Sequence, residues 1–445
     1  MSDWRSRYSD KLVSAEEAVA PIAAGAQVRL PMGPVPVTLI EALARRGDEL
    51  RDLTVVQGAS RHPHPWSQGS SEWRGRVQFV SDFLSPMLRA GMDARETDFA
   101  VTDYSVSHIV RAADGSPAYD RRDSFTPDVF LALVSEPDAD GMVSFGYSRW
   151  HSKELLEVAR YSVAEVGSDV LRPCGDTRVP LASFDRIVVQ SAPPMLVPPP
   201  QLTDARIEVT EVIGAYVSTL VNDGDTIQVG TGTLSSCMGS YLTEKSDLGV
   251  DAEILVASVV ELVKSGVATG VHKTHKPGVA TASFIVPGCD FAYCDENPKI
   301  ELHPISWCNN VNRISTIRNL IAINQASMID LTGQAASESI GPAMFTGSGG
   351  QLVWSMGALY APGGRAVLVL PSTARSGSVS RIVSAFDPGT IVTVPRTFVD
   401  FVVTEHGIAN LQGLTQRQRA LALIELAHPD HRDRLRSDAR RLFWP

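Results

Sequence analysis

The chain has little of what marks a secreted or membrane protein. Its 445 residues include only five cysteines, and none of them forms a Cys-x-x-Cys pair. An odd, unpaired set in a chain of this length fits reduced thiols rather than a disulfide framework. No apolar run approaches the roughly 20 residues of a membrane span, and the first residues lack the apolar segment of a signal peptide. We therefore expect a cytoplasmic protein with no membrane partner.

Positive charge and cofactor motifs are also scarce. Forty Lys and Arg residues against 50 Asp and Glu give a formal net charge of −10, which argues against a nucleic-acid partner. Gly230-Thr-Gly232 completes no dinucleotide fingerprint. The segment His62-Pro-His64-Pro has no nearby Cys or carboxylate to complete a metal site. We expect no metal and no tightly bound cofactor, and we predict a surface loop at residues 62–65.

What remains is the composition of a globular enzyme, with 44% hydrophobic and 20% charged residues. The length favours two domains. Prolines at 193, 194 and 198–200 form a stretch that neither a helix nor a central strand could cross. We predict the boundary there, with domains at residues 1–200 and 201–445.

A repeated pattern supports this division. Gly25 and Gly33 bracket a strand-like segment in the first half, and Gly224 and Gly232 bracket another at the same separation in the second. In each half a helix precedes the pair, and a helix and then a strand follow it. Strands that alternate with helices at this rhythm predict an α/β fold of two domains with mainly parallel sheets. The expected helices are 14–22, 38–46, 211–221, 235–243, 416–426 (with Thr415 as N-cap) and 430–442, and the expected strands are 53–57, 185–190, 253–257, 321–331, 365–371, 390–394 and 398–404.

The most specific motifs lie in the second half. They are Ile323-Asn-Gln-Ala-Ser-Met-Ile-Asp-Leu-Thr-Gly333, Phe345-Thr-Gly-Ser-Gly-Gly-Gln351 and Val403-Thr-Glu-His-Gly-Ile-Ala-Asn-Leu411. In this order they resemble the acetyl-CoA hydrolase/CoA-transferase family, in its 4-hydroxybutyrate CoA-transferase branch. The resemblance extends from about residue 18 to residue 431. It implies two tandem CoA-transferase-like domains, coenzyme A or an acyl-CoA as substrate, and a homodimer.

The resemblance also implies a mechanism. In the family a Glu carboxylate attacks the thioester, and the resulting acyl anhydride is converted into a glutamyl–CoA thioester that an acceptor carboxylate resolves. The position of that Glu is here assigned to Met328, and backbone amides of Gly349 and Gly350 are implied as the oxyanion hole. Val353 and Trp354 stand where the family pattern has Asp and Phe. The residues implied in CoA binding are Gly230, Gly232, Lys273, Gly347, Gly349 and Gly350.

A thioether cannot form an anhydride, so we expect turnover of a CoA thioester without a glutamyl nucleophile. Hydrolysis, or lyase or decarboxylase chemistry, would then use Glu405 as general base. Two alternatives stay open. One is a CoA-transferase that recruits Asp330 or Glu338 as a substitute carboxylate. The other is a non-catalytic CoA-ester-binding subunit or sensor.

Overall fold

The computed structural model describes residues 4–67, 71–102, 109–111, 117–119, 127–194 and 204–444. The chain divides into two compact units. The first unit comprises residues 1–198, 283–287 and 291–306, and the second comprises residues 199–282, 288–290 and 307–445. The predicted linker around residue 200 lies outside the described residues. Within the described ranges, no helix combines the length and the apolar character needed to cross a membrane.

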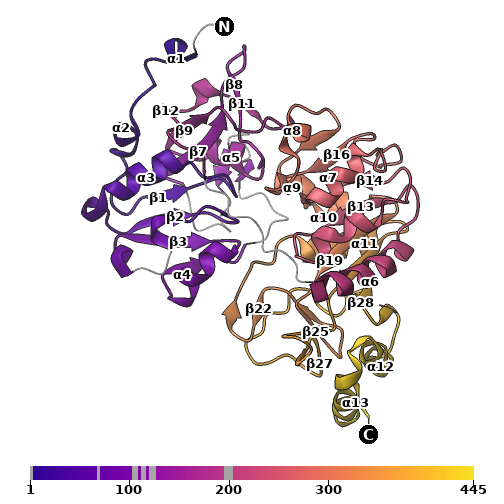
Figure 1. Ribbon diagram of the computed structural model, residues 1–445. Helices are drawn as coiled ribbons and strands as arrows, with labels where there is room; N and C mark the ends of the chain where they lie inside the picture. The colour runs from indigo at the N-terminus through magenta and orange to yellow at the C-terminus, as the bar shows by residue number, and fades with distance from the viewer. Residues whose placement is uncertain are drawn as a thin grey trace. The chain divides into compact units, whose positions relative to one another are not determined.

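The first unit is built on a seven-stranded sheet with the order β12-β9-β7-β1-β2-β3-β4, in which all neighbouring strands are parallel (Figure 1). Its sheet strands are β1 (Gln27–Arg29), β2 (Leu53–Val56), β3 (Val77–Ser81), β4 (Thr97–Phe99), β7 (Val129–Ser135), β9 (Tyr161–Gly167) and β12 (Arg186–Val189). Its helices are α1 (Trp4–Arg7), α2 (Ala15–Val19), α3 (Val37–Arg45), α4 (Arg89–Asp93), α5 (Ser152–Val158) and α8 (Phe291–Cys294). Short strands are β5 (Ile109–Arg111), β6 (Pro117–Tyr119), β8 (Met142–Ser144), β10 (Cys174–Gly175), β11 (Arg178–Pro180), β17 (Phe284–Ile285) and β18 (Ile300–Leu302).

The second unit has a six-stranded sheet with the order β14-β13-β19-β24-β28-β29, in which only the last pair is antiparallel. Its sheet strands are β13 (Thr226–Val229), β14 (Gly249–Val250), β19 (Leu320–Gln325), β24 (Arg365–Val369), β28 (Phe401–Thr404) and β29 (Gly407–Asn410). Its helices are α6 (Asp204–Leu220), η6 (Ser235–Tyr241), α7 (Ala257–Lys264), α10 (Val311–Ile314), α11 (Gln351–Tyr360), α12 (Gln416–Leu426) and α13 (Pro429–Phe443). Short strands are β15 (Ile254–Leu255), β16 (Ala280–Ala282), β20 (Met328–Asp330), β21 (Ala335–Ala336), β22 (Ser339–Ile340), β23 (Ala343–Met344), β25 (Thr373–Ala374), β26 (Val379–Ser380) and β27 (Ile382–Val383).

The two sheets share a strand order. The series β2-β1-β7-β9-β12 of the first unit corresponds to β14-β13-β19-β24-β28 of the second, and every pair in both series is parallel. The predicted α/β class with mainly parallel sheets is therefore confirmed. Since β1 and β13 are the strands bracketed by the paired glycines, the repeat in the sequence corresponds to a repeat in topology.

Several predicted elements differ from the structure. The strand predicted at 253–257 is reduced to the two-residue β15, and β14, also of two residues, takes the place beside β13. The segment 321–331 is not one strand, because Ala326 N–H donates to Val369 O in one sheet while Ser327 N–H donates to Ala336 O in another. Residues 390–394 form only an isolated bridge between Val394 and Ala335. The predicted helix 235–243 is the 3-10 helix η6.

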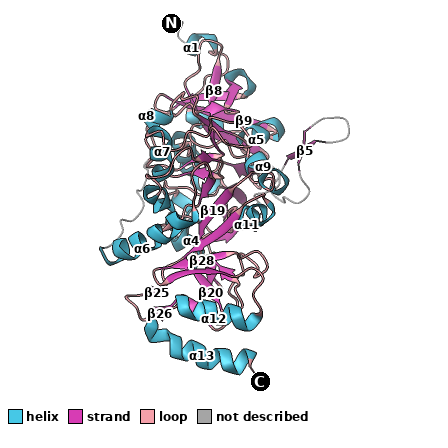
Figure 2. Cartoon of the chain, turned by 90° about the vertical axis from the view of Figure 1, so that its right-hand side faces the viewer, coloured by secondary structure: helices cyan, strands magenta, loops and turns pink. Residues whose placement is uncertain are grey.

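The helices of the second unit cover its sheet through apolar contacts. Helix α11 packs on β19 and β24 through a buried cluster that includes Leu320, Trp354 and Ala366. Figures 1 and 2 show this helix near β19. Helices α12 and α13 lie side by side at the C-terminal end (Figure 2). The N-cap predicted for α12 is confirmed, since the Thr415 side chain accepts from Gln418 N–H and the Gln418 side chain accepts from Thr415 N–H.

The surface loop predicted at residues 62–65 is wrong for His64. Its side chain is buried, its Nε2 lies 2.7 Å from Gln57 Oε1, and its ring stacks on Trp66 with 6.0 Å between centroids. Burial lowers the pKa of His64 to about 3, so the imidazole is neutral.

Candidate active site

Five parallel strands of the second unit end at one edge of its sheet, and polar residues gather there. In parallel α/β sheets ligands bind at the carboxyl ends of the strands. Gly230 follows β13, Gln325 ends β19 and Ser372 follows β24. Glu405 follows β28, and Glu253 lies shortly after β14. The sequence motifs therefore meet at the edge where a ligand is expected.

Glu253, which the sequence analysis missed, has the surroundings of a functional carboxylate. Its Oε2 accepts a hydrogen bond of 3.1 Å from Asn309 Nδ2, and Gly350 N–H also donates to the carboxylate. The side chain is partly exposed. Burial of the carboxylate nevertheless raises the pKa of Glu253 to about 7, although both hydrogen bonds act in the opposite direction. A glutamate tuned to neutral pH in an accessible position is a candidate nucleophile or base.

The glycine turn predicted as the oxyanion hole lies against Glu253. Gly350 is the N-cap of α11, and a Cβ at this position would overlap Glu253 Oε2. Only glycine therefore allows this approach. Gly349 precedes it with a left-handed φ of 54°, and Gly347 is buried. The free amides at the start of α11 favour negative charge on the Glu253 carboxylate.

Asn309 is fixed in one orientation. The residue is fully buried, and its Oδ1 accepts a hydrogen bond of 2.9 Å from Trp354 Nε1. An indole N–H can only donate, so the oxygen of the amide faces Trp354 and the NH₂ group faces Glu253. Trp354, which stands where the family pattern has Phe, thus contributes to the site through Asn309.

A buried ion pair holds the segment that carries Asn309. Arg313 donates to Asp251 through two hydrogen bonds of 3.0 and 2.7 Å, and it also donates to the carbonyls of Trp307 and Cys308. Burial acts to raise the pKa of Asp251, but the charges of Arg313 and Lys273 outweigh it and the pKa is lowered. The ion pair therefore ties residues 307–309 to the strand end that precedes Glu253.

Lys273 is not placed to bind CoA, contrary to the prediction. Its side chain is 1% exposed, with Nζ 3.9 Å from Asp251 Oδ2. The ammonium group donates to Val279 O and to Thr281 Oγ1. A phosphate could reach this cation only if these interior bonds were broken. Lys273 is instead a counter-ion of the buried Asp251.

The backbone N–H of Gly230, which was predicted to bind CoA, is already hydrogen-bonded within the protein. Gly230 N–H donates to Ile323 O, and a Cβ at this position would lie 2.6 Å from Asn324 Oδ1. At Gly232 a Cβ would overlap the side chain of Gln325, whose Oε1 accepts from Leu234 N–H. Both glycines therefore serve the close packing of this turn against the end of β19.

Three candidate positions, Met328, Asp330 and Glu338, lie in separate surroundings. Met328 belongs to β20 and pairs with Ala336 in a three-stranded sheet. Asp330 accepts four hydrogen bonds from Thr332 and Gln334, which close the turn after β20, so its carboxylate is structural. Glu338 is buried, which raises its pKa although the Thr393 hydroxyl acts against this.

Glu405 links the ends of β24 and β28. Its Oε2 accepts 2.9 Å from Ser372 N–H, and its Oε1 accepts 2.6 Å from Ser372 Oγ. His406 Nε2 lies 3.8 Å from Oε1. Each carboxylate oxygen thus accepts one hydrogen bond from Ser372 and retains a second lone pair, so Glu405 keeps the capacity to accept a proton.

Thiol chemistry has little support at this edge. Burial raises the pKa of Cys237 and of Cys308, so neither thiol is activated as a thiolate. The residues with described positions contain no group of three or more His, Cys, Asp or Glu side chains arranged to hold a metal ion.

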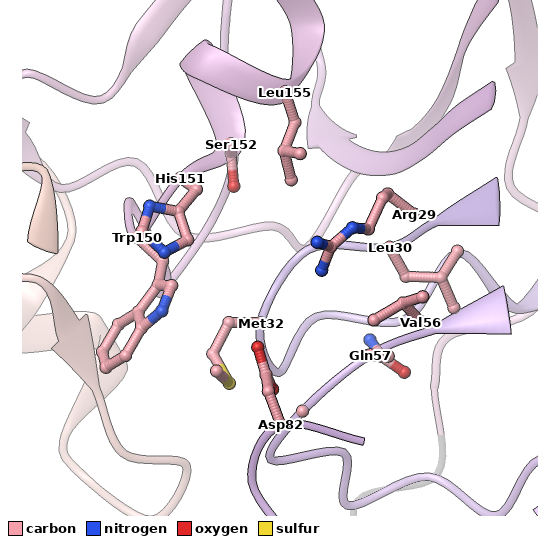
Figure 3. Close-up of a pocket in the computed structure, with 11 residues that line it drawn as sticks. Arg29, Leu30, Met32, Val56, Gln57, Asp82, Trp150, His151, Ser152 and Leu155 are labelled. Atoms are coloured by element: carbon pink, nitrogen blue, oxygen red, sulfur yellow. The ribbon is translucent and has the colours of Figure 1, made fainter. Parts of the chain in front are cut away.

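The first unit has a pocket of its own at the carboxyl ends of β1, β2 and β3 (Figure 3). Its interior space is small, about 20 Å³, close to the volume that holds one water molecule. Figure 3 shows Arg29, Asp82, His151 and Ser152 around an apolar surface that includes Met32. The lining therefore combines polar side chains with an apolar wall around a space of about water size. Its lining residues are Arg29, Leu30, Met32, Val56, Gln57, Gly58, Asp82, Trp150, His151, Ser152 and Leu155.

Comparison with known proteins places this fold among CoA-transferase-like α/β proteins. The acetyl-CoA hydrolase/transferase N-terminal domain matches residues 1–198, and the C-terminal domain of the same name matches residues 290–439. The chain belongs to the acetyl-CoA hydrolase/transferase family, whose members act on CoA thioesters.

Relatives that match over nearly the whole of both chains include proteins named as CoA-transferases. The 4-hydroxybutyrate coenzyme A transferase of Clostridium kluyveri is 33% identical over 99% of this chain and 100% of the relative. The succinyl-CoA:cyclohexane-1-carboxylate CoA transferase of Geobacter metallireducens is 31% identical over 99% of this chain and 97% of the relative. Among solved structures, RipA from Yersinia pestis superposes with a TM-score of 0.88 at 30% identity and covers both chains fully.

Proposed function

We propose that this protein is an acyl-CoA:carboxylate CoA-transferase with Glu253 as its nucleophile. The observation that carries the proposal is the contact of the Glu253 carboxylate with Gly350 at the N-terminus of α11. The family pattern puts the nucleophile position at Met328, which by itself favours hydrolysis or lyase chemistry. A carboxylate beside the glycine turn removes the reason for that choice.

The mechanism implied by the family resemblance can be written on these residues. The Glu253 carboxylate attacks the thioester carbonyl, CoA leaves as the thiolate, and an acyl–glutamyl anhydride forms. The thiolate then attacks the glutamyl carbonyl and releases the first carboxylate product. A second carboxylate then attacks the glutamyl–CoA thioester, which forms a new anhydride and releases CoA thiolate. The thiolate attacks the acyl carbonyl of this anhydride, and a new acyl-CoA and free Glu253 result.

Asn309 and Gly350 support this cycle because Asn309 Nδ2 donates to Glu253 Oε2 and Gly350 N–H donates to the same carboxylate. Oε2 becomes the carbonyl oxygen of the glutamyl thioester when Oε1 is the attacking atom. Negative charge develops on this oxygen in each tetrahedral intermediate at the glutamyl carbon. The Asn309 donor at that oxygen, together with the Gly350 amide on the same carboxylate, would stabilise the charge.

The test is mass spectrometry of the protein incubated with a panel of acyl-CoAs, with and without acetate or succinate. We expect a covalent CoA adduct on the peptide that contains Glu253, and a new acyl-CoA only when the acceptor is present. The Glu253→Gln variant should lose the adduct, and its kcat should fall by about 10³-fold or more, as for removal of other covalent nucleophiles. Glu244→Gln, which changes an exposed carboxylate, is the matched control and should keep both.

Other outcomes would replace the proposal. Free CoA released without an acceptor would indicate a hydrolase, and a shortened acyl chain would indicate a lyase or decarboxylase. Unchanged acyl-CoA in the presence of binding would indicate a non-catalytic subunit or sensor. If Met328→Glu restored activity to the Glu253→Gln variant, the original placement of the nucleophile would be right.

We also propose that the protein is a cytoplasmic homodimer. The family resemblance supports the dimer, and the five unpaired thiols support a reducing compartment. Light scattering of the eluted protein should give twice the mass of one chain, and a value equal to one chain would contradict the dimer.

A further inference from the structure

Resting on the proposed function, we propose that Trp354 is a positioning residue that keeps the NH₂ group of Asn309 directed at the nucleophile. Trp354 does not contact Glu253 through any described hydrogen bond. It donates its single N–H to Asn309 Oδ1, and Asn309 Nδ2 donates to Glu253 Oε2. The indole therefore acts through the amide.

The main chain around Asn309 is fixed, but the terminal torsion of its side chain is not, and Trp354 restricts this torsion. Arg313 binds the carbonyls of Trp307 and Cys308 and is itself held by Asp251, so the main chain is fixed. The terminal torsion of an Asn side chain is broad and nearly two-fold. Rotation by half a turn exchanges the oxygen and the NH₂ group at almost no change in shape. Without Trp354, only the Glu253 carboxylate would select between the two orientations, and this selection weakens whenever the carboxyl group is uncharged.

The packing of Trp354 fixes the direction of its N–H. The indole is fully buried, in a cluster with Ile314, Leu320 and Ala358 between α11 and the sheet. A donor held in this way accepts only the orientation with Oδ1 toward it. The reversed amide would set Oδ1 against the Glu253 carboxylate, with two acceptors facing each other.

Loss of this N–H has consequences specific to the reaction. The reversed amide withdraws the Asn309 donor from Glu253 Oε2, the oxygen on which negative charge develops when the glutamyl carbon is attacked. Loss of a complete donor typically costs about 10²-fold in kcat, and a mixture of orientations should cost about 10-fold. Substrate binding does not involve this bond, so KM should change by less than about twofold.

The experiment replaces Trp354 by 3-benzothienylalanine, in which sulfur takes the place of the indole N–H while the bicyclic shape is kept. We expect kcat to fall about 10-fold with KM nearly unchanged, and the acid limb of the rate profile to move to higher pH. Trp354→Phe should show the same changes with an added loss of thermal stability from the cavity. Tyr360→Phe removes a hydroxyl from the exposed end of the same helix and should leave kcat unchanged.

A second arm decides whether the effect passes through Asn309. In an Asn309→Ala background the benzothienyl replacement should cause no further loss of kcat. A loss as large as in the parent protein would overturn the proposal, as would a benzothienyl variant with parental kcat and acid limb.

The test remains separable from the proposed function. Carbon-13 NMR of labelled glutamate, with the Glu253 signal assigned from Glu253→Gln, follows the titration of this carboxyl group directly. A shift to higher pH in the benzothienyl variant supports positioning even if Glu253→Gln keeps its covalent adduct and the proposed function fails. An unchanged titration contradicts positioning whatever the activity shows.

Discussion

At the scale of single residues, two opposing effects determine the pKa of Glu253. Removal of its carboxylate from water disfavours the charged form, while Asn309 and Gly350 donate hydrogen bonds that favour it. Burial is the larger effect, and the pKa rises to about 7. A carboxylate with this pKa is a better nucleophile than an ordinary one and is still half ionised near neutral pH.

This balance predicts the pH dependence of the reaction. Only the ionised carboxylate attacks a thioester, so kcat/KM for acyl-CoA should rise with pH and level off above about 7. Below that value the rate should fall by about 10-fold for each pH unit, as for a single titrating group. Steady-state rates between pH 5.5 and 8.5 measure this limb. A flat profile over the same range would contradict a nucleophile with a raised pKa.

The sequence could indicate the glycine turn but not the carboxylate beside it. Gly350 lies in a dense local motif, whereas Glu253 stands in an unremarkable Asp-Ala-Glu-Ile run that we predicted as a strand. Its partner Asn309 is 56 residues away along the chain. Such a contact depends on the order of strands in the folded sheet, which no local pattern specifies. Lys273 was misjudged for a related reason, because its burial beside Asp251 is also a tertiary effect.

At the scale of elements, the first turn of α3 is capped from a distant strand. Pro36, its N-cap, offers no side-chain hydrogen bond. Glu165 on β9 takes this role, since its carboxylate accepts from Leu39 N–H and Thr38 Oγ1 at 3.0 Å each. The carboxylate is buried, and burial raises the pKa of Glu165 to about 7.

Glu165 should therefore make stability fall with rising pH. Because its pKa is higher in the folded than in the unfolded chain, its contribution is fully present below the unfolded pKa. The contribution is lost as pH rises through about 7. Between pH 5 and 8 the parent protein should lose up to about 3 kcal/mol more unfolding free energy than Glu165→Gln. Urea denaturation at both pH values measures the difference, and equal losses in the two proteins would show that Glu165 is ionised throughout.

Loss of the ion pair between Arg313 of α10 and Asp251, which follows β14, should lower the free energy of unfolding substantially. Arg313→Met would leave Asp251 buried next to Lys273 alone, and loss of one partner of a buried ion pair typically costs about 3–5 kcal/mol. The exposed pair Arg45–Glu16 offers a control, since Arg45→Met should cost less than about 1 kcal/mol. Chemical denaturation of both variants tests this. Similar small losses would mean that the buried pair contributes little.

Element prediction from the sequence succeeded where signals were local. Helix α12 was located to the residue because its capping box and its apolar spacing are both present in the chain. Strand β14 was missed because only two residues pair in it and one is Gly249.

At the scale of the whole molecule, one arrangement of strands is used twice. The glycine spacing made this repeat visible in the sequence, because it recurs within short segments of each half. The assignment of residues 283–287 and 291–306 to the first unit had no such signal. These segments follow much of the second unit along the chain, and only tertiary contacts return them to the first.

The position of Trp354 has a practical consequence. An indole is fluorescent, and its emission responds to electric fields in its surroundings. Conversion of the Glu253 carboxylate into a neutral thioester would change the field one amide away from this indole. The chain has seven tryptophans, so the difference in emission between the parent protein and Trp354→Phe would isolate the signal of this one. In a stopped-flow instrument that signal would make the formation and decay of the covalent intermediate visible without a labelled substrate.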